Sequence, residues 1–167
     1  MKRLLIVWHS HTGGSRQMAE AAAGAARREE GREEGIEVRL QHAAATQPAD
    51  VLAADGYLFV TPENLASMSG LMKDFFDRVY YPVLDRLNGR PYAALVCAGS
   101  DGSGAVRQIE RIATGLRLKA VAPPLIVITR AQTPEAILAP KTIGPADLAR
   151  CAEVGAGLAA GLAAGVF

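Results

Sequence analysis

Five short apolar runs rich in β-branched residues recur along this chain, and they constrain its fold more than any other feature. Each run is followed by turn residues and usually by a stretch with helical periodicity. Near-continuous apolar strands that alternate with helices are typical of a parallel sheet covered on both faces, so five of them predict a doubly wound α/β sheet of order 2-1-3-4-5. The predicted strands are Leu4–Trp8, Ile36–Leu40, Gly56–Val60, Tyr92–Cys97 and Pro124–Thr129.

Length and composition bound the possible functions. The chain has 167 residues, 50% of them hydrophobic, which is enough to bury one substantial core, and we expect one domain over residues 1–167. A formal net charge of +1 without a basic run argues against nucleic acid as a main partner. Cys97 and Cys151 lie far apart, so neither a disulfide framework nor a zinc site is predicted. The amino terminus lacks the pattern of a secretory signal and residues 154–167 are too short to span a bilayer, which makes the cytoplasm the expected compartment.

The first predicted strand runs into a loop with the composition of a phosphate-binding turn. The loop consists of Ser10, His11, Thr12, Gly13, Gly14 and Ser15. An alanine-rich helix is predicted to follow from Arg16 to about Arg28, and its free N–H groups and positive dipole end would face an anion in the turn. No lysine or arginine lies in the loop, so neutral donors would hold the phosphate, which favours a flavin phosphate over a nucleotide triphosphate. The alternative is an ordinary turn with a helix N-cap.

Two stretches of the sequence resemble a known superfamily. The spacing Ser10-x-Thr12-Gly13-x-Ser15 after an N-terminal strand resembles the FMN-phosphate loop of the flavodoxin-like superfamily. The run from Thr61 to Arg78 resembles the loop and helix after the third strand in FMN reductases and in quinone oxidoreductases of the Trp repressor-binding protein type. The resemblance covers residues 4–150, and it implies a flavodoxin-like fold with FMN as cofactor and NAD(P)H as electron donor.

The loops after the third and fourth strands are expected to hold the flavin ring. In the second loop we expect Pro62 to end the strand, Glu63, Asn64 and Leu65 to border the isoalloxazine, and Ser67 or Ser69 to cap the next helix. In the third loop, backbone N–H groups are expected to point at the pyrimidine edge of the flavin. The third-loop residues concerned are Ala98, Gly99, Ser100, Asp101, Gly102 and Ser103.

Neither of these two loops contains an aromatic residue, whereas simple flavodoxins commonly sandwich their flavin between aromatic side chains. One ring face is therefore expected to be open to a second substrate, which favours an NAD(P)H-dependent two-electron reductase of quinones or free flavin. The flavin performs the redox chemistry, so no catalytic side chain is assigned. The alternatives are an electron carrier that needs a redox partner and a flavin-free interaction module on the same fold; a homo-oligomer is also possible.

Several other residues could belong to the site or to the core. His11 could donate to phosphate, whereas His9 and His42 are expected to be structural and no metal site is predicted around them. Trp8 is expected in a buried sheet position. Cys97 is expected to be a buried strand-end residue, not a nucleophile.

Three further patterns carry less specific expectations. The helical spacing of Phe75, Phe76 and Val79 places them in the core. Gly157, Gly161 and Gly165 recur every fourth residue, which indicates close packing on the sheet of the domain or, alternatively, a dimer contact. A tandem Arg-Glu-Glu-Gly repeat in residues 28–35 is expected to be a solvated helix end or loop.

Overall fold

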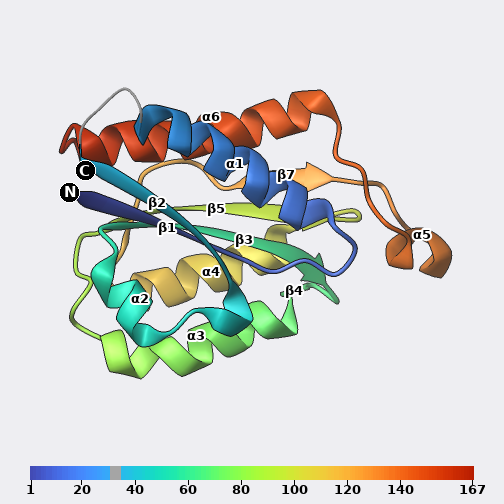
Figure 1. The fold of residues 1–167 in the computed structure, drawn as a ribbon. Coiled ribbons are helices and arrows are strands. Elements are labelled where there is room, and N and C mark those ends of the chain that lie inside the picture. Colours follow the sequence, from blue (N-terminus) through green and yellow to red (C-terminus); the bar gives the residue numbers. More distant parts are fainter. Residues whose placement is uncertain (31–34) are drawn as a thin grey trace.

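The computed structural model describes residues 1–30 and 35–167. A parallel sheet lies between two layers of helices (Figure 1). Its strands, in spatial order, are β2 (Ile36–His42), β1 (Lys2–Trp8), β3 (Gly56–Asn64) and β5 (Pro91–Ala98), with β6 (Lys119–Ala120) and β7 (Leu125–Ile128) both pairing with β5. This arrangement confirms the predicted order 2-1-3-4-5. The buried apolar runs produce it because both faces of each strand are covered.

The fifth position of the sheet is shared by two short strands. β6 pairs with the start of β5 and β7 pairs with its end, and the chain between them contains Pro123 and Pro124. Proline has no N–H to give to a ladder, which accounts for the interruption. The predicted strand Pro124–Thr129 therefore corresponds to β7, whereas β6 was not predicted.

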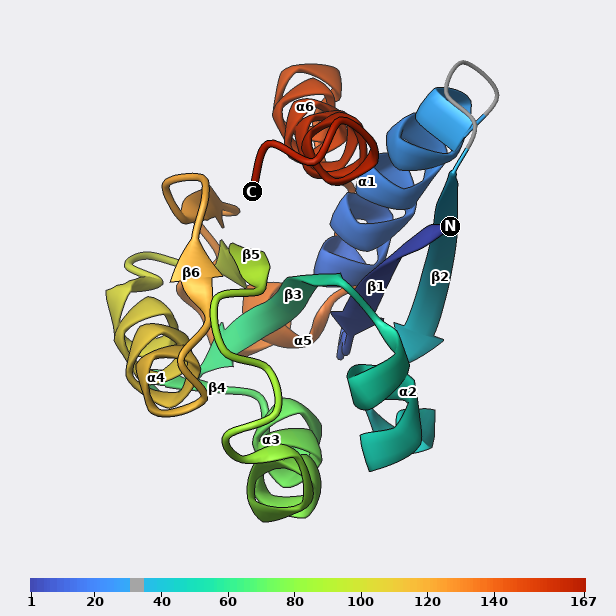
Figure 2. The ribbon, with the colours of Figure 1, turned by 90° about the vertical axis from the view of Figure 1, so that its left-hand side faces the viewer.

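Helices cover the two faces unequally. α1 (Gly14–Glu30) and α6 (Pro145–Ala163) lie on one face, and α2 (Pro48–Ala53), α3 (Gly70–Val83) and α4 (Ser103–Gly115) lie on the other (Figure 2). The short α5 (Pro134–Leu138) projects beyond the carboxyl ends of the strands, at the right-hand side of Figure 1. The 3-10 turn η1 (Ala43–Ala45) and the two-residue strand β4 (Ser67–Met68) complete the fold.

The core has two halves, one on each side of the sheet. Phe75, Phe76 and Val79 of α3 are buried against Phe59 of β3, as predicted, and the rings of Phe59 and Phe76 lie 5.0 Å apart. On the other side, small alanine side chains of α1 bring that helix close to strands β1 and β3. Burial of these side chains supplies most of the stabilisation that fixes the strand ends in place.

The glycines of α6 differ from the expectation. Gly155 is the residue that permits close approach, because a Cβ there would collide with the backbone of Ala22 in α1. Gly157 faces open space, Gly161 contacts the ring of Phe167, and Gly165 has a φ of +65° just beyond the helix. The close contact is therefore made between α6 and α1 of the same chain. It lies at Gly155, two residues before the first of the three predicted glycines.

Two further expectations concern the ends of elements and the membrane. α1 continues to Glu30, so the tandem Arg-Glu-Glu-Gly repeat begins inside this helix, and half of it, residues 31–34, lies outside the described residues. Within residues 1–30 and 35–167, no helix is both long enough and apolar enough to cross a membrane.

Candidate functional site

The carboxyl ends of β1, β3 and β5 meet at one edge of the sheet, where two adjoining pockets open. One pocket, of about 330 Å³, is lined by residues 62–66 and 97–100 together with Thr12, Ile137 and Lys141. The other, of about 400 Å³, is lined by residues 10–13 and by Trp8, Arg16, His42 and the residues Leu138 and Pro140 beside α5. Thr12 lines both. Ligands of doubly wound folds bind at this edge. We call the first cavity the ring pocket, because the two loops expected to hold the flavin ring line it, and the second cavity the loop pocket, because the first loop lines it.

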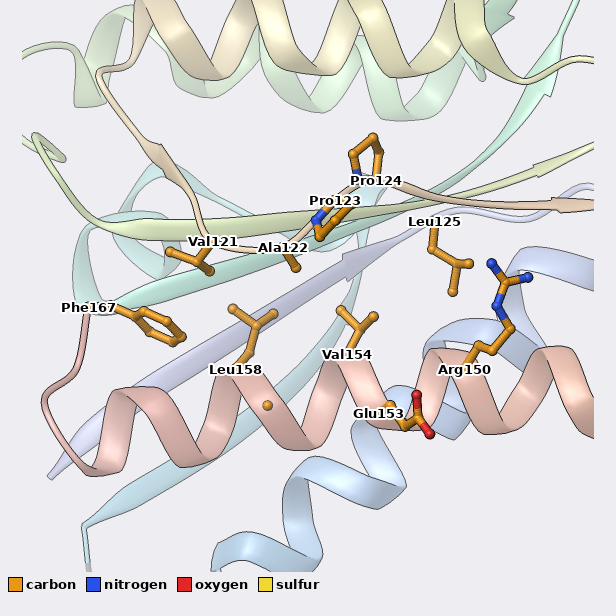
Figure 3. A pocket seen from close by; sticks show the side chains of 11 residues that line it. Val121, Ala122, Pro123, Pro124, Leu125, Arg150, Glu153, Val154, Leu158 and Phe167 are labelled. Atoms are coloured by element: carbon orange, nitrogen blue, oxygen red, sulfur yellow. The ribbon is translucent and has the colours of Figure 1, made fainter.

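A larger groove of about 440 Å³ lies elsewhere and does not join this site. It runs between residues 121–125 and the face of α6 that carries Val154 and Leu158 (Figure 3). Phe167 lies at one end and Arg150 near the other. None of its lining residues belongs to the loops that follow β1, β3 and β5.

The first loop, residues 10–15, is held by its own hydrogen bonds. Gly13 has a φ of +94°, which lets the chain turn into α1, and its N–H donates to Ser10 Oγ at 3.0 Å. Ser15 is buried, and its hydroxyl donates to the carbonyl of His9 at 2.6 Å. The single proton of Ser15 is thus committed to the backbone, so we correct its expected role as a phosphate donor to that of an anchor of the loop. The Ser10 hydroxyl, by contrast, accepts the Gly13 N–H and donates to no acceptor among the described residues.

The imidazole of His9 lies beneath this loop at the start of a buried chain of hydrogen bonds. Its Nδ1 lies 2.7 Å from Ser69 Oγ, which lies 3.2 Å from Thr61 Oγ1. The Thr61 hydroxyl donates to the carbonyl of Pro62, and the Ser69 hydroxyl links His9 Nδ1 to Thr61 Oγ1. Burial, and then the neighbouring His11 and His42, lower the pKa of His9 to about 4, so the ring is neutral at pH 7.

Aromatic residues from the ends of β1 and β2 line the loop pocket. His11 is exposed and its ring lies edge-on to that of His9, with 4.7 Å between the centroids. His42 Nδ1 accepts the N–H of Ala44 and caps η1, which is a structural role. Trp8 is only half-buried and packs edge-on against His42, so it lines the loop pocket instead of being enclosed in the sheet. Among the described residues, no group of three or more His, Cys, Asp or Glu side chains is placed to hold a metal ion.

The second loop is a hairpin, which the sequence reading did not predict. β3 continues through Pro62 to Asn64 and turns back into β4, with Asn64 opposite Ser67. Pro62 therefore does not end the strand, since its fixed φ suits extended backbone at a position where the ladder ends. The two turn residues, Leu65 and Ala66, have φ values of 50° and 61°, and the Leu65 side chain is fully exposed. Such a turn favours Asn-Gly, so Leu-Ala at this position is strained.

Ser69 occupies the N-cap of α3, but its hydroxyl makes no cap hydrogen bond. It bonds instead to His9 and Thr61, two polar groups that are buried beside it. Ser67 lies in β4 and bonds to Gln108 Oε1 of α4. Ser69 therefore occupies the expected cap position, but its side chain does not make the cap hydrogen bond.

Glu63 has a partner that the sequence did not reveal. Its carboxylate accepts the N–H groups of Gly102 at 2.9 Å and Ala105 at 3.1 Å, at the N-terminus of α4. A carboxylate is favoured there by the helix dipole. Glu63 also lines the ring pocket, as do Asn64 and Leu65, so it joins the second loop to the third.

The third loop divides into two parts. Ala98, Gly99 and Ser100 line the ring pocket, and a Cβ at Gly99 would lie 2.5 Å from the carbonyl of Ala131. Asp101, Gly102 and Ser103 do not line it. Their N–H groups or side chains are engaged locally, and hydrogen bonds from Ser103 lower the pKa of the Asp101 carboxyl. Of this loop, residues 98–100 are the ones that line the ring pocket, and a role of residues 101–103 in flavin binding stays a prediction.

Cys97 lies at the floor of the ring pocket. It is buried, and burial raises the pKa of its thiol to about 11 although the nearby charge of Lys141 acts in the opposite direction. A neutral thiol is a poor nucleophile, which agrees with the structural role predicted for Cys97. A Cβ at Gly14 would lie 2.7 Å from the Cys97 sulfur, so a glycine is needed where α1 begins.

The ring pocket includes one wall that no sequence pattern indicated. The connection between β7 and α6 contributes Thr129, Ala131, Ile137 and Lys141. Thr129 and Ala131 approach the third loop, where Thr129 N–H donates to the carbonyl of Ala98. Thr133 followed by Pro134 is a sequence signal for the start of a helix, and Thr133 does cap α5. No signal in the sequence indicates that this helix lies near the strand ends.

Comparisons with known proteins agree with this geometry. The sequence profile described as NADPH-dependent FMN reductase matches residues 37–133, which include the second and third loops. The chain is 36% identical over 104 residues to a flavodoxin of Aquifex aeolicus (strain VF5), covering 62% of this chain and 54% of that protein. It is 35% identical over 98 residues to an NAD(P)H dehydrogenase (quinone) of Acidithiobacillus ferrooxidans (strain ATCC 53993 / BNL-5-31), covering 47% of each.

A solved structure with the same fold is the flavodoxin, WrbA-like protein from Agrobacterium tumefaciens, with a TM-score of 0.72 over 96% of each chain at 18% identity. That similarity shows the fold alone. The chain spans about half the length of the curated relatives that it matches. The profile match covers more than half of the chain and both ring-facing loops, and on that ground the protein belongs to the NADPH-dependent FMN reductase family of the flavodoxin-like superfamily.

Proposed function

We propose that this chain is an FMN-binding oxidoreductase that takes electrons from NAD(P)H and passes them, two at a time, to a quinone or to free flavin. The observation that carries the proposal is the composition of the ring pocket. Its described lining contains small, aliphatic and polar residues but no aromatic side chain. A flat ring held there keeps one face open, and a second flat molecule can stack on it.

The phosphate end of the site fits FMN. The N–H groups of the first turn of α1 have no intrahelical partner, and the half-buried Thr12 lies between the two pockets. Gly13 and Gly14 allow the loop to close, because a side chain at either would be strained or would collide with Cys97. A loop that closes around a terminal phosphate favours FMN over FAD, whose adenylate would have to extend past it.

The ring end fits an isoalloxazine. Gly99 and Ser100 of the third loop and residues 62–66 of the second loop line the same pocket. Glu63 is engaged by the α4 N-terminus and the Cys97 thiol is neutral, so these two groups line the pocket without adding a free reactive charge. Bound FMN supplies the redox chemistry, while the protein binds and orients it.

A second candidate function is that of an electron carrier. It is favoured by the 36% identity to a protein named flavodoxin. A carrier would pass single electrons to a partner protein and would accumulate the one-electron-reduced flavin. The two candidates therefore differ in a spectroscopic property as well as in activity.

The deciding experiment begins with reconstitution of the purified chain with FMN or FAD. An anaerobic titration with NADPH or NADH then follows the flavin absorbance, and benzoquinone or excess FMN is added as acceptor. We expect FMN to bind in preference to FAD, little one-electron-reduced flavin, and turnover without a partner protein. Slow turnover with strong accumulation of the one-electron state would favour the carrier, and absence of flavin binding would exclude both.

A further inference from the structure

The connection between β7 and α6, residues 129–144, which we call the strap, is tied to the first loop although the two are far apart in sequence. Lys141 N–H donates to the carbonyl of Thr12 at 2.8 Å. The Gln17 side chain donates to the carbonyls of Gly13 at 2.9 Å and Lys141 at 2.7 Å, and its oxygen accepts the N–H of Ile143 at 3.0 Å. These four bonds hold the backbone of Lys141 beside the first turn of α1.

The side chain of Lys141 starts at the mouth of the first loop. A Cβ built at Gly14, the first residue of α1, would lie 3.5 Å from the Cβ of Lys141. The side chain then reaches the end of α5, where its Nζ donates to the carbonyls of Ala136 at 2.7 Å, Ile137 at 2.9 Å and Ala139 at 2.6 Å. Because these carbonyls belong to the same strap, the ammonium and the segment that carries it are ordered together.

The positive charge of Lys141 is hydrogen-bonded but not neutralised. Its three acceptors are neutral carbonyls, and within the described part of the chain no carboxylate pairs with it. Two other lysines differ, since Lys2 pairs with Asp55 and Lys73 pairs with Asp77. Lys141 is the only basic residue among the described residues that line the ring pocket, and it lines that pocket together with Thr12.

We propose that Lys141 is a cationic ligand for the cofactor phosphate, supplied to the first loop from the strap. The inference rests on the proposed function, because that function places FMN at this edge. When the phosphate enters the first loop, one of the Nζ–H bonds to a neutral carbonyl is exchanged for a bond to a phosphate oxygen, in which donor and acceptor carry opposite charges. The sequence predicts that neutral donors alone hold the phosphate, whereas the proposal adds one cationic donor to them.

The test compares FMN with riboflavin, which has the same ring but no phosphate. Dissociation constants are measured by quenching of flavin fluorescence for the intact chain and for Lys141→Met, Lys141→Arg and Lys73→Met. We expect Lys141→Met to weaken FMN binding about ten- to a hundredfold, as for loss of one hydrogen bond to a charged group, and to leave riboflavin binding unchanged. Lys141→Arg should retain most of the FMN affinity. Lys73→Met removes a lysine on the exposed face of α3 and should change neither constant.

The salt dependence gives a second readout. FMN binding to the intact chain should weaken with rising ionic strength more steeply than FMN binding to Lys141→Met. The proposal is overturned if Lys141→Met binds FMN as tightly as the intact chain, or if it loses riboflavin affinity to the same extent, because the lysine would then act through packing of the strap. If the intact chain binds neither flavin, the proposed function itself fails. If the intact chain binds FMN and the methionine variant binds it equally well, only the assignment of Lys141 fails.

Discussion

The two ends of the site are built in opposite ways. The first loop, at the phosphate end, is anchored from beneath by buried polar groups, since Ser15 bonds to the carbonyl of His9 and the His9 ring bonds to Ser69. The hairpin tip at the ring end, residues 65–66, has two left-handed residues and a fully exposed leucine. Left-handed backbone costs roughly 1–2 kcal/mol for each residue with a side chain.

This difference indicates that the two ends of the site contribute differently to cofactor binding. A loop that is already ordered loses little entropy when a phosphate binds, so it can supply affinity. A strained, solvent-exposed turn gains most when something covers it, so it can respond to the ring or to a second substrate. The following predictions test whether the two ends differ as the structure indicates.

The largest expected effect is at Thr12, at the phosphate end. Thr12→Asp places a carboxylate where the phosphate binds, and we expect FMN affinity to fall by at least about a hundredfold. Thr12→Ala loses one hydrogen bond to a charged group and should weaken FMN about ten- to a hundredfold. Fluorescence titration measures both. Thermal melting of each variant should match that of the intact chain, because Thr12 is half-buried on a loop.

A control for Thr12 is available on α4. Thr114 lies on the exposed side of that helix, where its hydroxyl donates to the carbonyl of Glu110. Thr114→Asp should therefore leave FMN binding unchanged. If Thr12→Asp binds FMN like the intact chain, the first loop is an ordinary turn and the comparison between the two ends has no basis.

The second prediction concerns the support beneath the first loop. The pKa of His9 is lowered to about 4 in the folded chain, whereas it is near 6.5 when unfolded, so the unfolded state binds more protons between these values. The contribution of neutral His9 to stability is complete above pH 6.5 and is lost as the pH falls towards 4. We expect the free energy of unfolding to drop by about 2 kcal/mol between pH 7 and pH 5 because of this residue.

Urea unfolding at the two pH values measures that drop. His9→Asn is the matched variant, because its amide can donate to Ser69 but does not titrate. The variant should be less stable than the intact chain at pH 7 and should lose less stability on going to pH 5. Equal losses in the two proteins would show that His9 is not the group that titrates.

The smallest expected effect is at the hairpin tip. Leu65→Gly removes a side chain that is fully exposed and relieves a φ of 50°, so we expect the free energy of unfolding to rise by about 1 kcal/mol. The same change removes an apolar group from the edge of the ring pocket and should weaken binding of FMN and riboflavin alike. Chemical unfolding and fluorescence titration measure the two effects.

Ala66→Gly provides the comparison within the same turn. It relieves a φ of 61° but removes only a methyl group, so it should stabilise the chain without weakening riboflavin binding as much as Leu65→Gly does. If neither glycine variant is more stable, the turn stores no strain. The backbone of the hairpin tip would then be as free of strain as that of the first loop, and the two ends of the site would not differ in this respect.

The sequence by itself determined the order of the sheet and the character of the first loop. Both depend on local features, since apolar runs alternate with helices over short distances and Gly13 and Gly14 stand where α1 begins. The positions of the second and third loops follow as well, because parallel strands bring their carboxyl ends to one edge. The burial of Phe75 and Phe76 follows from helical spacing alone.

Tertiary structure alone decided which polar groups are free to bind a ligand. Ser15 and Ser69 look in sequence like a phosphate donor and a helix cap, but each is engaged by a buried group, and Glu63 is engaged by a helix that begins at Ser103. A hydroxyl or carboxylate bonds to whichever partner burial leaves beside it, and that neighbour is set by packing and not by spacing along the chain. The arrival of Lys141 at Thr12 has the same cause, because a contact between residues so far apart depends on how α6 and the strap pack over the strand ends.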